Sequence, residues 1–352
     1  MFEKRWMVSM SMVFILLLPA VALAGEWAKT LGGTGDDSAS FVQLALGGGY
    51  IVAGTTNSFG AGNNDIWLLR LDPDGNVQWQ KTYGDAGYNS ASSVQLTSDG
   101  GYIVAGTTQS RNGDFLVLRL DRDGNILWQR AYGLSGFIPP DHFDHYSESD
   151  PRILPTIDGG YILAGKSASL IGGSPFLCVF KLDVFGNIEW KKDYGDISSF
   201  RSIRQTADRG YILAANYTVS RGWGMISGFS LLIKLDEAGN AVWRRGYGNR
   251  NWWDYNTFDD IASLLPTGDG YIMGGATESL GMGSKGLWLL KVDSNGEIIS
   301  CPAIWPGAPV SNDIPELGQI GIDFSATVAD TSVTGSDTAA VRATTAAFET
   351  DG

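Results

Sequence analysis

The chain has 352 residues, of which 43% are hydrophobic and 18% are charged, with 47 glycines and 12 tryptophans. Many glycines beside many aromatic residues indicate short strands and tight turns. The formal net charge of −13 argues against a nucleic acid partner and against an anionic membrane surface, because both require a basic face. Two cysteines are too few for a disulfide framework in an exported chain.

Residues 1–24 have the features of a signal peptide. Lys4 and Arg5 precede an apolar run that ends in Ala22-Leu23-Ala24, which fits the small-x-small cleavage rule. An uncleaved membrane anchor is the alternative, but the run is short for a spanning helix. We therefore expect export to the periplasm or the outside of the cell, without membrane insertion after cleavage.

Five internal repeats follow the signal peptide, and together they cover 25–301. Repeats at this period are typical of propellers and solenoids. The repeat limits are about 27–78, 79–127, 128–189, 190–242 and 243–300. Three series of equivalent residues fix the alignment, namely Trp27, Trp79, Trp128, Trp190 and Trp243; Tyr50, Tyr102, Tyr161, Tyr211 and Tyr271; and Asp72, Asp121, Asp183, Asp236 and Asp293.

Each repeat contains four strand-like runs, which we name A to D. In the first repeat they are 41–46, 50–55, 66–71 and 77–83. Gly-Gly or Asp-Gly separates A from B, and Asp-x-Asp-Gly-Asn separates C from D, as tight hairpins require. Strands such as YIVAG and WLLRL are apolar on both faces, as expected for sheets that are covered on both sides. The sequence therefore predicts an all-β protein, a β-propeller of five four-stranded blades, with a long solenoid as the structural rival.

Closure of the ring leaves two alternatives for the last strand. The segment 26–31 matches strand D of the other repeats and would complete the fifth blade, whose first three strands lie within 258–293. The segment 297–300 could also supply that strand, but Ser300 stands where the other repeats carry tryptophan. We favour the N-terminal segment because it keeps the tryptophan.

The repeat pattern KTYG…DGGYIVAGTT…LDxDGNxxW resembles a family of uncharacterised secreted bacterial and archaeal β-propeller repeats, over residues 26–300. The Asp-x-x-Gly-x-x-x-Trp spacing is also distantly similar to the repeat of quinoprotein-type propellers. These resemblances imply a fold and not a reaction, since one fold hosts many functions.

The C-terminal tail, 302–352, differs from the repeats. It opens with three prolines and continues with an Ala/Thr/Ser/Asp-rich stretch, SATVADTSVTGSDTAAV. This composition predicts a disordered tail, because it offers too little apolar surface to bury. A linker or a surface-attachment stub is the alternative.

Topology predicts that the D-to-A and B-to-C connections leave from one face of the ring and the short A-to-B and C-to-D turns from the other. The D-to-A and B-to-C connections vary widely in length, and function commonly lies on such loops. One insertion, 139–150, holds both histidines among carboxylates. His142, His145, Asp141 and Asp144 could form a divalent metal site, and a plain polar surface loop is the alternative. We predict no other cofactor.

A second insertion, 249–256, contains Trp252, Trp253, Asp254 and Tyr255, and Trp223 lies in the B-to-C connection of the fourth repeat. Exposed aromatic rings beside carboxylates and amides can stack on sugars and bind their hydroxyl groups. The alternative is that these rings cap the core between blades, since exposed aromatic side chains are costly without a partner.

Four further features have structural interpretations. The Asp-x-Asp-Gly-Asn turns depart from the EF-hand spacing, so turn chemistry is favoured over calcium binding. The Asp36-Asp37 and Asp259-Asp260 pairs are expected to accept loop hydrogen bonds. Cys178 aligns with core positions and is expected to be buried. The basic column, which comprises Arg70, Arg119, Lys181, Lys234 and Lys291, predicts an ion pair that is repeated in every blade.

The sequence favours a non-catalytic binding or scaffold module that takes a glycan or a protein through 139–150, 217–228 and 249–258. A polysaccharide hydrolase is the alternative, with acids drawn from Asp141, Asp144, Glu148, Asp254 or Asp259. A purely structural surface protein is a third possibility. The repeats contain no convergent His/Asp/Glu set that fixes a carboxylate separation of the glycosidase type.

Overall fold

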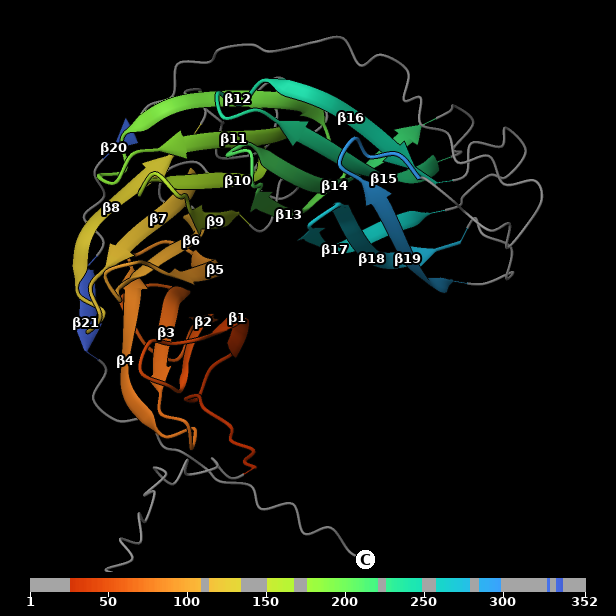
Figure 1. The fold of residues 1–352 in the computed structure, drawn as a ribbon. Coiled ribbons are helices and arrows are strands. Elements are labelled where there is room, and N and C mark those ends of the chain that lie inside the picture. The colour runs from red at the N-terminus through yellow and green to blue at the C-terminus, as the bar shows by residue number, and fades with distance from the viewer. Residues whose placement is uncertain are drawn as a thin grey trace, which may run out of the picture.

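The structure is a computed structural model that describes residues 26–108, 114–133, 151–167, 176–220, 226–248, 258–278, 285–298, 328–329 and 334–337. These residues form strands and turns without a helix. The strands make five antiparallel sheets, and the sheets follow one another in an open arc (Figure 1). The coarse prediction, an all-β protein built from repeated four-stranded units, is confirmed.

The five sheets correspond to the five repeats, and we call them blades one to five. Blade one contains β1 (Asp37–Leu44), β2 (Tyr50–Thr56), β3 (Asp65–Leu71) and β4 (Val77–Gly84). Blade two contains β5 (Asn89–Leu96), β6 (Tyr102–Thr108), β7 (Asp114–Leu120) and β8 (Ile126–Tyr132). Blade three contains β9 (Arg152–Pro155), β10 (Tyr161–Ser167), β11 (Phe176–Leu182) and β12 (Ile188–Asp196). Blade four contains β13 (Ser199–Gln205), β14 (Tyr211–Ser220), β15 (Ile226–Leu235) and β16 (Ala241–Tyr247). Blade five contains β17 (Asp259–Thr267), β18 (Gly270–Thr277) and β19 (Gly286–Asp293).

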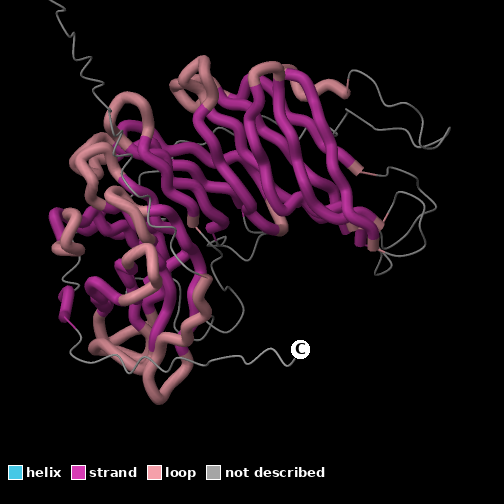
Figure 2. The backbone as a smooth tube through the Cα atoms, turned by 60° about the horizontal axis from the view of Figure 1, so that its bottom comes forward, coloured by secondary structure: helices cyan, strands magenta, loops and turns pink. Residues whose placement is uncertain are grey.

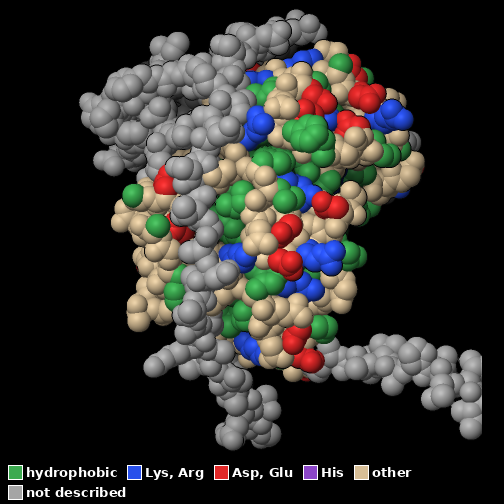
Figure 3. Space-filling view, turned by 90° about the vertical axis from the view of Figure 1, so that its left-hand side faces the viewer, with side chains coloured by type: hydrophobic (Ala, Val, Ile, Leu, Met, Phe, Trp, Pro, Cys, Tyr) green, Lys and Arg blue, Asp and Glu red, His purple; other side chains and the backbone are tan. Residues whose placement is uncertain are grey.

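Within each blade the strands are hydrogen-bonded in chain order. The A strands lie on the concave inner side of the arc and the D strands on its outer side (Figure 1). Seen from a second direction, neighbouring sheets stack face to face (Figure 2). On the outer side, basic, acidic and apolar side chains are interspersed (Figure 3).

The core lies between blades. Each blade has a forward face, toward the next blade, and a rear face, toward the previous one. The forward face of blade one, with Ile51, Ile66 and Leu68, packs in one cluster with Val104 and Leu118 from the rear face of blade two. Both faces of an inner blade are therefore buried, which explains why the B and C strands are apolar throughout.

A recurrent bulge in strand A explains one glycine of the YIVAG motif. The pairing of β1 with β2 shifts between Ala39 and Phe41, which brings the Ser38 carbonyl toward Gly54. A Cβ at Gly54 would lie 2.1 Å from that oxygen, and one at Gly106 would meet Ser90 in the same way. The strand needs glycine there because the neighbouring backbone approaches so closely.

The two ends of the arc are exposed. Val42 on the rear face of blade one is 62% exposed, whereas its equivalents Val94, Ile153 and Ile203 are fully buried. Leu289 on the forward face of blade five is 69% exposed, whereas its equivalent Leu68 is fully buried. Blade five has three strands among the described residues, and the closed ring expected from the repeats is not shown.

The tail contributes two short strands in its described part. β20 (Val328–Ala329) pairs with β8, and β21 (Thr334–Asp337) pairs with β4, so each extends a blade at its outer edge. These six residues differ from the expected disorder because strand addition satisfies the open hydrogen-bonding groups of an edge strand. The rest of 302–352 lies outside the described residues.

Candidate functional site

The connections that vary in length all leave the blades at one end. In an antiparallel blade the D-to-A and B-to-C connections share an end, and the observed pairings obey this order. The predicted metal ligands (His142, His145, Asp141, Asp144) and the predicted ligand-binding residues (Trp223, Trp252, Trp253, Asp254, Tyr255) all belong to such connections. They lie outside the described residues, as does Glu148, so these predictions remain predictions.

At this end, Asp37 begins strand A of blade one and accepts three short hydrogen bonds. Its carboxylate accepts hydrogen bonds from the hydroxyls of Thr56 and Ser58 at 2.5 and 2.7 Å and from the backbone N–H of Gly33 at 2.8 Å. Burial raises the pKa of Asp37, but these donors outweigh it, so the pKa lies below its usual value. Asp259 takes the equivalent place in blade five and accepts from Thr277 at 2.5 Å. The predicted role as hydrogen-bond acceptors is confirmed for both residues.

Asp65 is a carboxylate that the sequence analysis missed. It begins β3 and is almost fully buried, and it accepts the backbone N–H groups of Ala61 and Gly62 at 2.8 and 3.3 Å. Burial raises its pKa, these two donors oppose the shift, and nearby Asp85 adds to it. A raised carboxyl pKa is typical of acid–base catalysts, but both donors come from the connection directly before Asp65. The geometry supports a role in holding that connection.

The short turns lie at the other end of the blades and are nearly identical. In the first C-to-D turn, Asp72 accepts the backbone N–H of Asn76 at 2.8 Å and its side-chain amide at 2.9 Å. Gly75 has φ +72°, the left-handed region that suits glycine. The turn at Asp121, Gly124 and Asn125 repeats this arrangement. The expected tight turns and their hydrogen bonds are observed.

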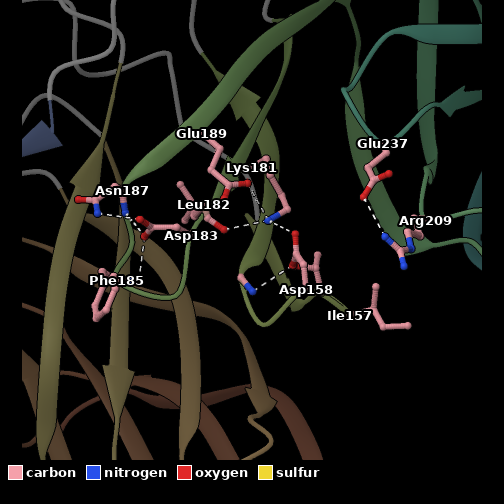
Figure 4. A network of polar contacts seen from close by, with 12 residues as sticks. Ile157, Asp158, Lys181, Leu182, Asp183, Phe185, Asn187, Glu189, Arg209 and Glu237 are labelled. Atoms are coloured by element: carbon pink, nitrogen blue, oxygen red, sulfur yellow. Dashed lines mark hydrogen bonds and ion pairs between the residues drawn. The ribbon is translucent and has the colours of Figure 1, made fainter.

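The basic column makes the predicted ion pairs in four blades. Its partner is the aspartate of the A-to-B turn, in the pairs Arg119–Asp99, Lys181–Asp158 at 2.8 Å, Lys234–Asp208 at 2.8 Å and Lys291–Asp269 at 2.7 Å. Figure 4 shows Lys181 between Asp158 and Glu189, with the Asp183 turn beside it. Burial raises the pKa of Asp158, but the hydrogen bond from Lys181 and that from Thr156 lower it to about 2.

Blade one departs from this pattern, and the prediction of an ion pair in every blade is wrong there. Gly47 stands where blade two has Asp99, so the Arg70 guanidinium has no carboxylate partner among the described residues. Arg70 donates instead to backbone carbonyls, including those of Gly48 at 2.6 Å and Leu46 at 3.3 Å.

A second basic column, on the D strands, was also missed. Lys192 donates to the Ala238 carbonyl and to the Asn240 side chain of the next blade, both at 2.7 Å. Lys81 reaches Asn125 at 2.8 Å in the same way. Alignment of the D strands would have revealed these cations, which tie blade one to blade two and blade three to blade four.

The other groups that could react or bind a ligand are Cys178, possible metal ligands and one crevice. Cys178 is fully buried, as predicted, and burial raises the pKa of its thiol to about 12. No group of three or more His, Cys, Asp or Glu residues that could hold a metal occurs within the described ranges. A search of the same ranges found no helix with the length and apolar character needed to cross a membrane. A mostly apolar crevice is lined by Met273, Trp288 and Leu290 of blade five and by Ser230 of blade four.

No protein-family model matches the chain. No relative was found among curated proteins. Among solved structures, the chain is similar to a protein of unknown function from Bacteroides caccae, with a TM-score of 0.45 and 14% identity. The similarity covers 75% of this chain and 80% of that chain.

Proposed function

We propose that this protein is an exported, non-catalytic β-propeller of five blades that binds a glycan or a protein partner at the end bearing its long connections. The proposal rests on the difference between the two ends of the blades. At the short-turn end the C-to-D turns repeat one set of contacts and the ion pair recurs in blades two to five, whereas the connections that differ in length lie at the other end. Variable connections on a rigid repeated frame suit recognition.

The use of polar groups in the frame favours binding over catalysis. The carboxylates of the C-to-D turns accept hydrogen bonds from their own turns. Four of the five cations of the basic column form ion pairs with the aspartate of the A-to-B turn. Asp37 accepts hydrogen bonds from nearby donors, and one carboxylate oxygen of Asp65 accepts from Ala61 and Gly62. A hydrolase would need two carboxylates at a defined separation, whereas the carboxylates named here accept hydrogen bonds from turns and loops.

Closure of the ring is part of the proposal, and the contacts of the N-terminal segment support it. Trp27 Nε1 donates to the Pro73 carbonyl at 3.0 Å, as Trp128 Nε1 of blade two donates to the Val184 carbonyl of blade three at 3.2 Å. Lys29 donates to the Asp74 carbonyl at 2.9 Å and to Asn76 at 2.7 Å, as Lys192 does in its own interface. Residues 27–31 therefore contact blade one as strand D of a preceding blade would.

The fifth blade has no strand D among the described residues. Residues 27–31, at the start of the arc, could fill this position at its end. Burial gives the driving force, because Leu44, 70% exposed, and Leu287, 82% exposed, would both be covered on closure. Equivalent strands pair Trp79 with Arg70, which predicts that Trp27 pairs with Lys291 and Ala28 with Leu290.

Disulfide trapping tests the closure. The variant combines Ala28→Cys with Leu290→Cys in a background where Cys178 and Cys301 are replaced by serine. We expect rapid oxidation to a monomer with a faster gel mobility under non-reducing conditions. A matched control, Ala28→Cys with Leu265→Cys, should not cross-link within the monomer. Disulfide-linked dimers in place of the monomeric species would show that the exposed faces meet between copies and would reject the closed ring.

A glycan array and a pull-down test the binding proposal. We expect retention on a defined ligand to be lost in the double variant Trp252→Ala, Trp253→Ala while the melting temperature changes little. The control is Trp27→Ala, which alters an interface of the frame. Unchanged retention in the double variant would reject these aromatic residues as the binding site, and turnover of a bound polysaccharide would favour the hydrolase. Metal analysis of the purified protein tests the site at His142 and His145.

A further inference from the structure

Two buried side-chain oxygens at the junction of blades one and two have no hydrogen-bond donor among the described residues. They are Oδ1 of Asp65, at the start of β3, and Oδ1 of Asn89, at the start of β5. Both residues are only 1% exposed. The other oxygen of Asp65 accepts the N–H groups of Ala61 and Gly62. Because a buried acceptor has given up its hydration, each unpaired oxygen requires a donor or a cation.

The two side chains meet over Gly84, the last residue of β4. A Cβ added at Gly84 would lie 1.6 Å from Asp65 Oδ1 and 3.0 Å from Asn89 Nδ2. The same Nδ2 donates to Asp85 Oδ1 at 3.1 Å and to the Gly87 carbonyl at 3.4 Å. Two carboxylates, one amide oxygen and one backbone carbonyl therefore gather around the Asn89 side chain.

Among the described residues, no lysine or arginine offsets the charge of Asp65. None of their ion pairs involves this residue. Burial raises the pKa of its carboxyl, and nearby Asp85 adds to the shift. A buried charge without a counter-charge is costly, so the cluster attracts a cation.

The ligand atoms indicate which cation fits. Carboxylate, amide and backbone carbonyl oxygens are the usual ligands of calcium, whereas zinc prefers nitrogen and sulfur and magnesium keeps several of its waters. Oxygens that share one calcium ion lie about 2.4 Å from it, so they are at most about 5 Å apart. The contacts around the Asn89 amide are compatible with this spacing. Rotation of the amide about its Cβ–Cγ bond exchanges Nδ2 for Oδ1 and would turn the oxygen toward Asp85 and Gly87.

We propose that Asp65, Asp85, Asn89 and the Gly87 carbonyl form a calcium site between blades one and two. The site joins the B-to-C connection of blade one to the connection that leads into blade two, at the end of the long connections. It goes beyond the proposed binding function and does not depend on it, because the calcium would hold two connections together whatever ligand binds there.

The combination of residues is specific to this junction, and this supplies a matched control. The two connections lie side by side here, since the backbone of Asn64 pairs with that of Tyr88. Between blades three and four, Asp196 stands at the position of Asp85. There, however, Phe176 begins strand C in place of Asp65, so the second carboxylate is absent from that position.

Calcium chloride is the probe, and magnesium chloride at the same ionic strength is the reference, both added to protein stripped with EDTA. We expect calcium at about 1–10 mM, the range that suits extracellular calcium modules, to raise the melting temperature of the wild-type protein more than magnesium does. The reason is that a ligand which binds only the folded state stabilises it. Equal effects of the two salts, or no effect of calcium, would overturn the proposal and would indicate a water or a proton between the two oxygens.

Variants tie the response to this cluster. Asp65→Asn keeps the shape of the side chain without its charge and should lose the calcium-induced rise. Asn89→Asp adds a third carboxylate, so it should melt lower in EDTA and bind calcium roughly tenfold more tightly, a gain that general destabilisation would not produce. Asp196→Asn should keep the wild-type response. The double variant His142→Ala, His145→Ala should keep it too, which separates this site from the metal site predicted in 139–150.

Calorimetric titration with calcium measures the affinity of each variant. A calcium response that persists in Asp65→Asn would overturn the site. An affinity that Asn89→Asp leaves unchanged would also overturn it, because that carboxylate would then lie outside the coordination sphere.

Discussion

The hydroxyl of Tyr83 donates a 2.6 Å hydrogen bond to the carbonyl oxygen of Gly124, which lies in the C-to-D turn of the next blade. The same contact joins Tyr132 to Gly186 at 2.6 Å, and it recurs for Tyr194 and Tyr247. The partner glycine also receives the ring of a D-strand tryptophan, since a Cβ on Gly124 would lie 3.0 Å from Trp79. One turn thus anchors both aromatic residues of the preceding D strand.

Replacing Tyr83 with phenylalanine should lower the free energy of unfolding by about 1 kcal/mol, because the buried Gly124 carbonyl loses its donor. Urea unfolding measures the change. Tyr88→Phe is the control, because Tyr88 is 48% exposed. Equal losses in the two variants would mean that the inter-blade hydrogen bond contributes nothing measurable.

Alanine substitutions at two glycines of blade three should distinguish the cost of backbone strain from the cost of side-chain crowding. Gly186 has φ +78° and would place a Cβ 2.9 Å from the Trp128 ring, whereas Gly159 has φ +87° with nothing within 4 Å. Both alanine variants should lose about 1 kcal/mol to the left-handed backbone. Gly186→Ala should lose a further 1–3 kcal/mol, roughly, to overpacking against the tryptophan. Thermal unfolding of both variants gives the comparison, and similar values would show that the ring moves aside freely.

The sequence predicted the blades well because their determinants are local and repeated. In the first repeat, apolar runs and glycine turns place strands B, C and D within one residue of their observed bounds, whereas strand A begins four residues earlier than predicted. The sequence shows Gly47 in place of Asp99, but only the structure shows that Arg70, which lacks this partner, is buried. The proposed ring closure could not be predicted in the same way, because it depends on contacts between the first and the last repeat, which are far apart in the sequence.

The thiol of Cys178 should be inert in the folded protein. It is fully buried, and burial raises its pKa to about 12, so little thiolate exists at neutral pH. In a Cys301→Ser variant, which leaves one thiol, iodoacetamide labelling should be slow in buffer and fast in denaturant. Mass spectrometry follows the label. Rapid labelling of the folded variant would place Cys178 in a region that opens readily.

The turn aspartates predict how acid acts on the fold. Burial raises the pKa of Asp158, but the hydrogen bond from Lys181 outweighs it and, with Thr156, brings the pKa to about 2. Asp208 also has a lowered pKa, because the hydrogen bonds from Lys234 and Thr206 outweigh its burial. A carboxyl whose pKa is lower in the folded than in the unfolded state stabilises the fold above the unfolded value, which is 3.8 for these groups.

This stabilisation should be fully present above about pH 5 and should be lost as the pH falls through 3.8 toward 2. Urea unfolding at pH 6, 4, 3 and 2.5 gives the profile. Asp158→Asn should be less stable at pH 6 and should show a smaller loss on acidification, since it has no proton to take up at this site. Asp74→Asn, which removes an exposed turn carboxylate outside the ion pairs, is the control. A wild-type slope that is unchanged in Asp158→Asn would remove the ion pair with Lys181 as a source of acid sensitivity.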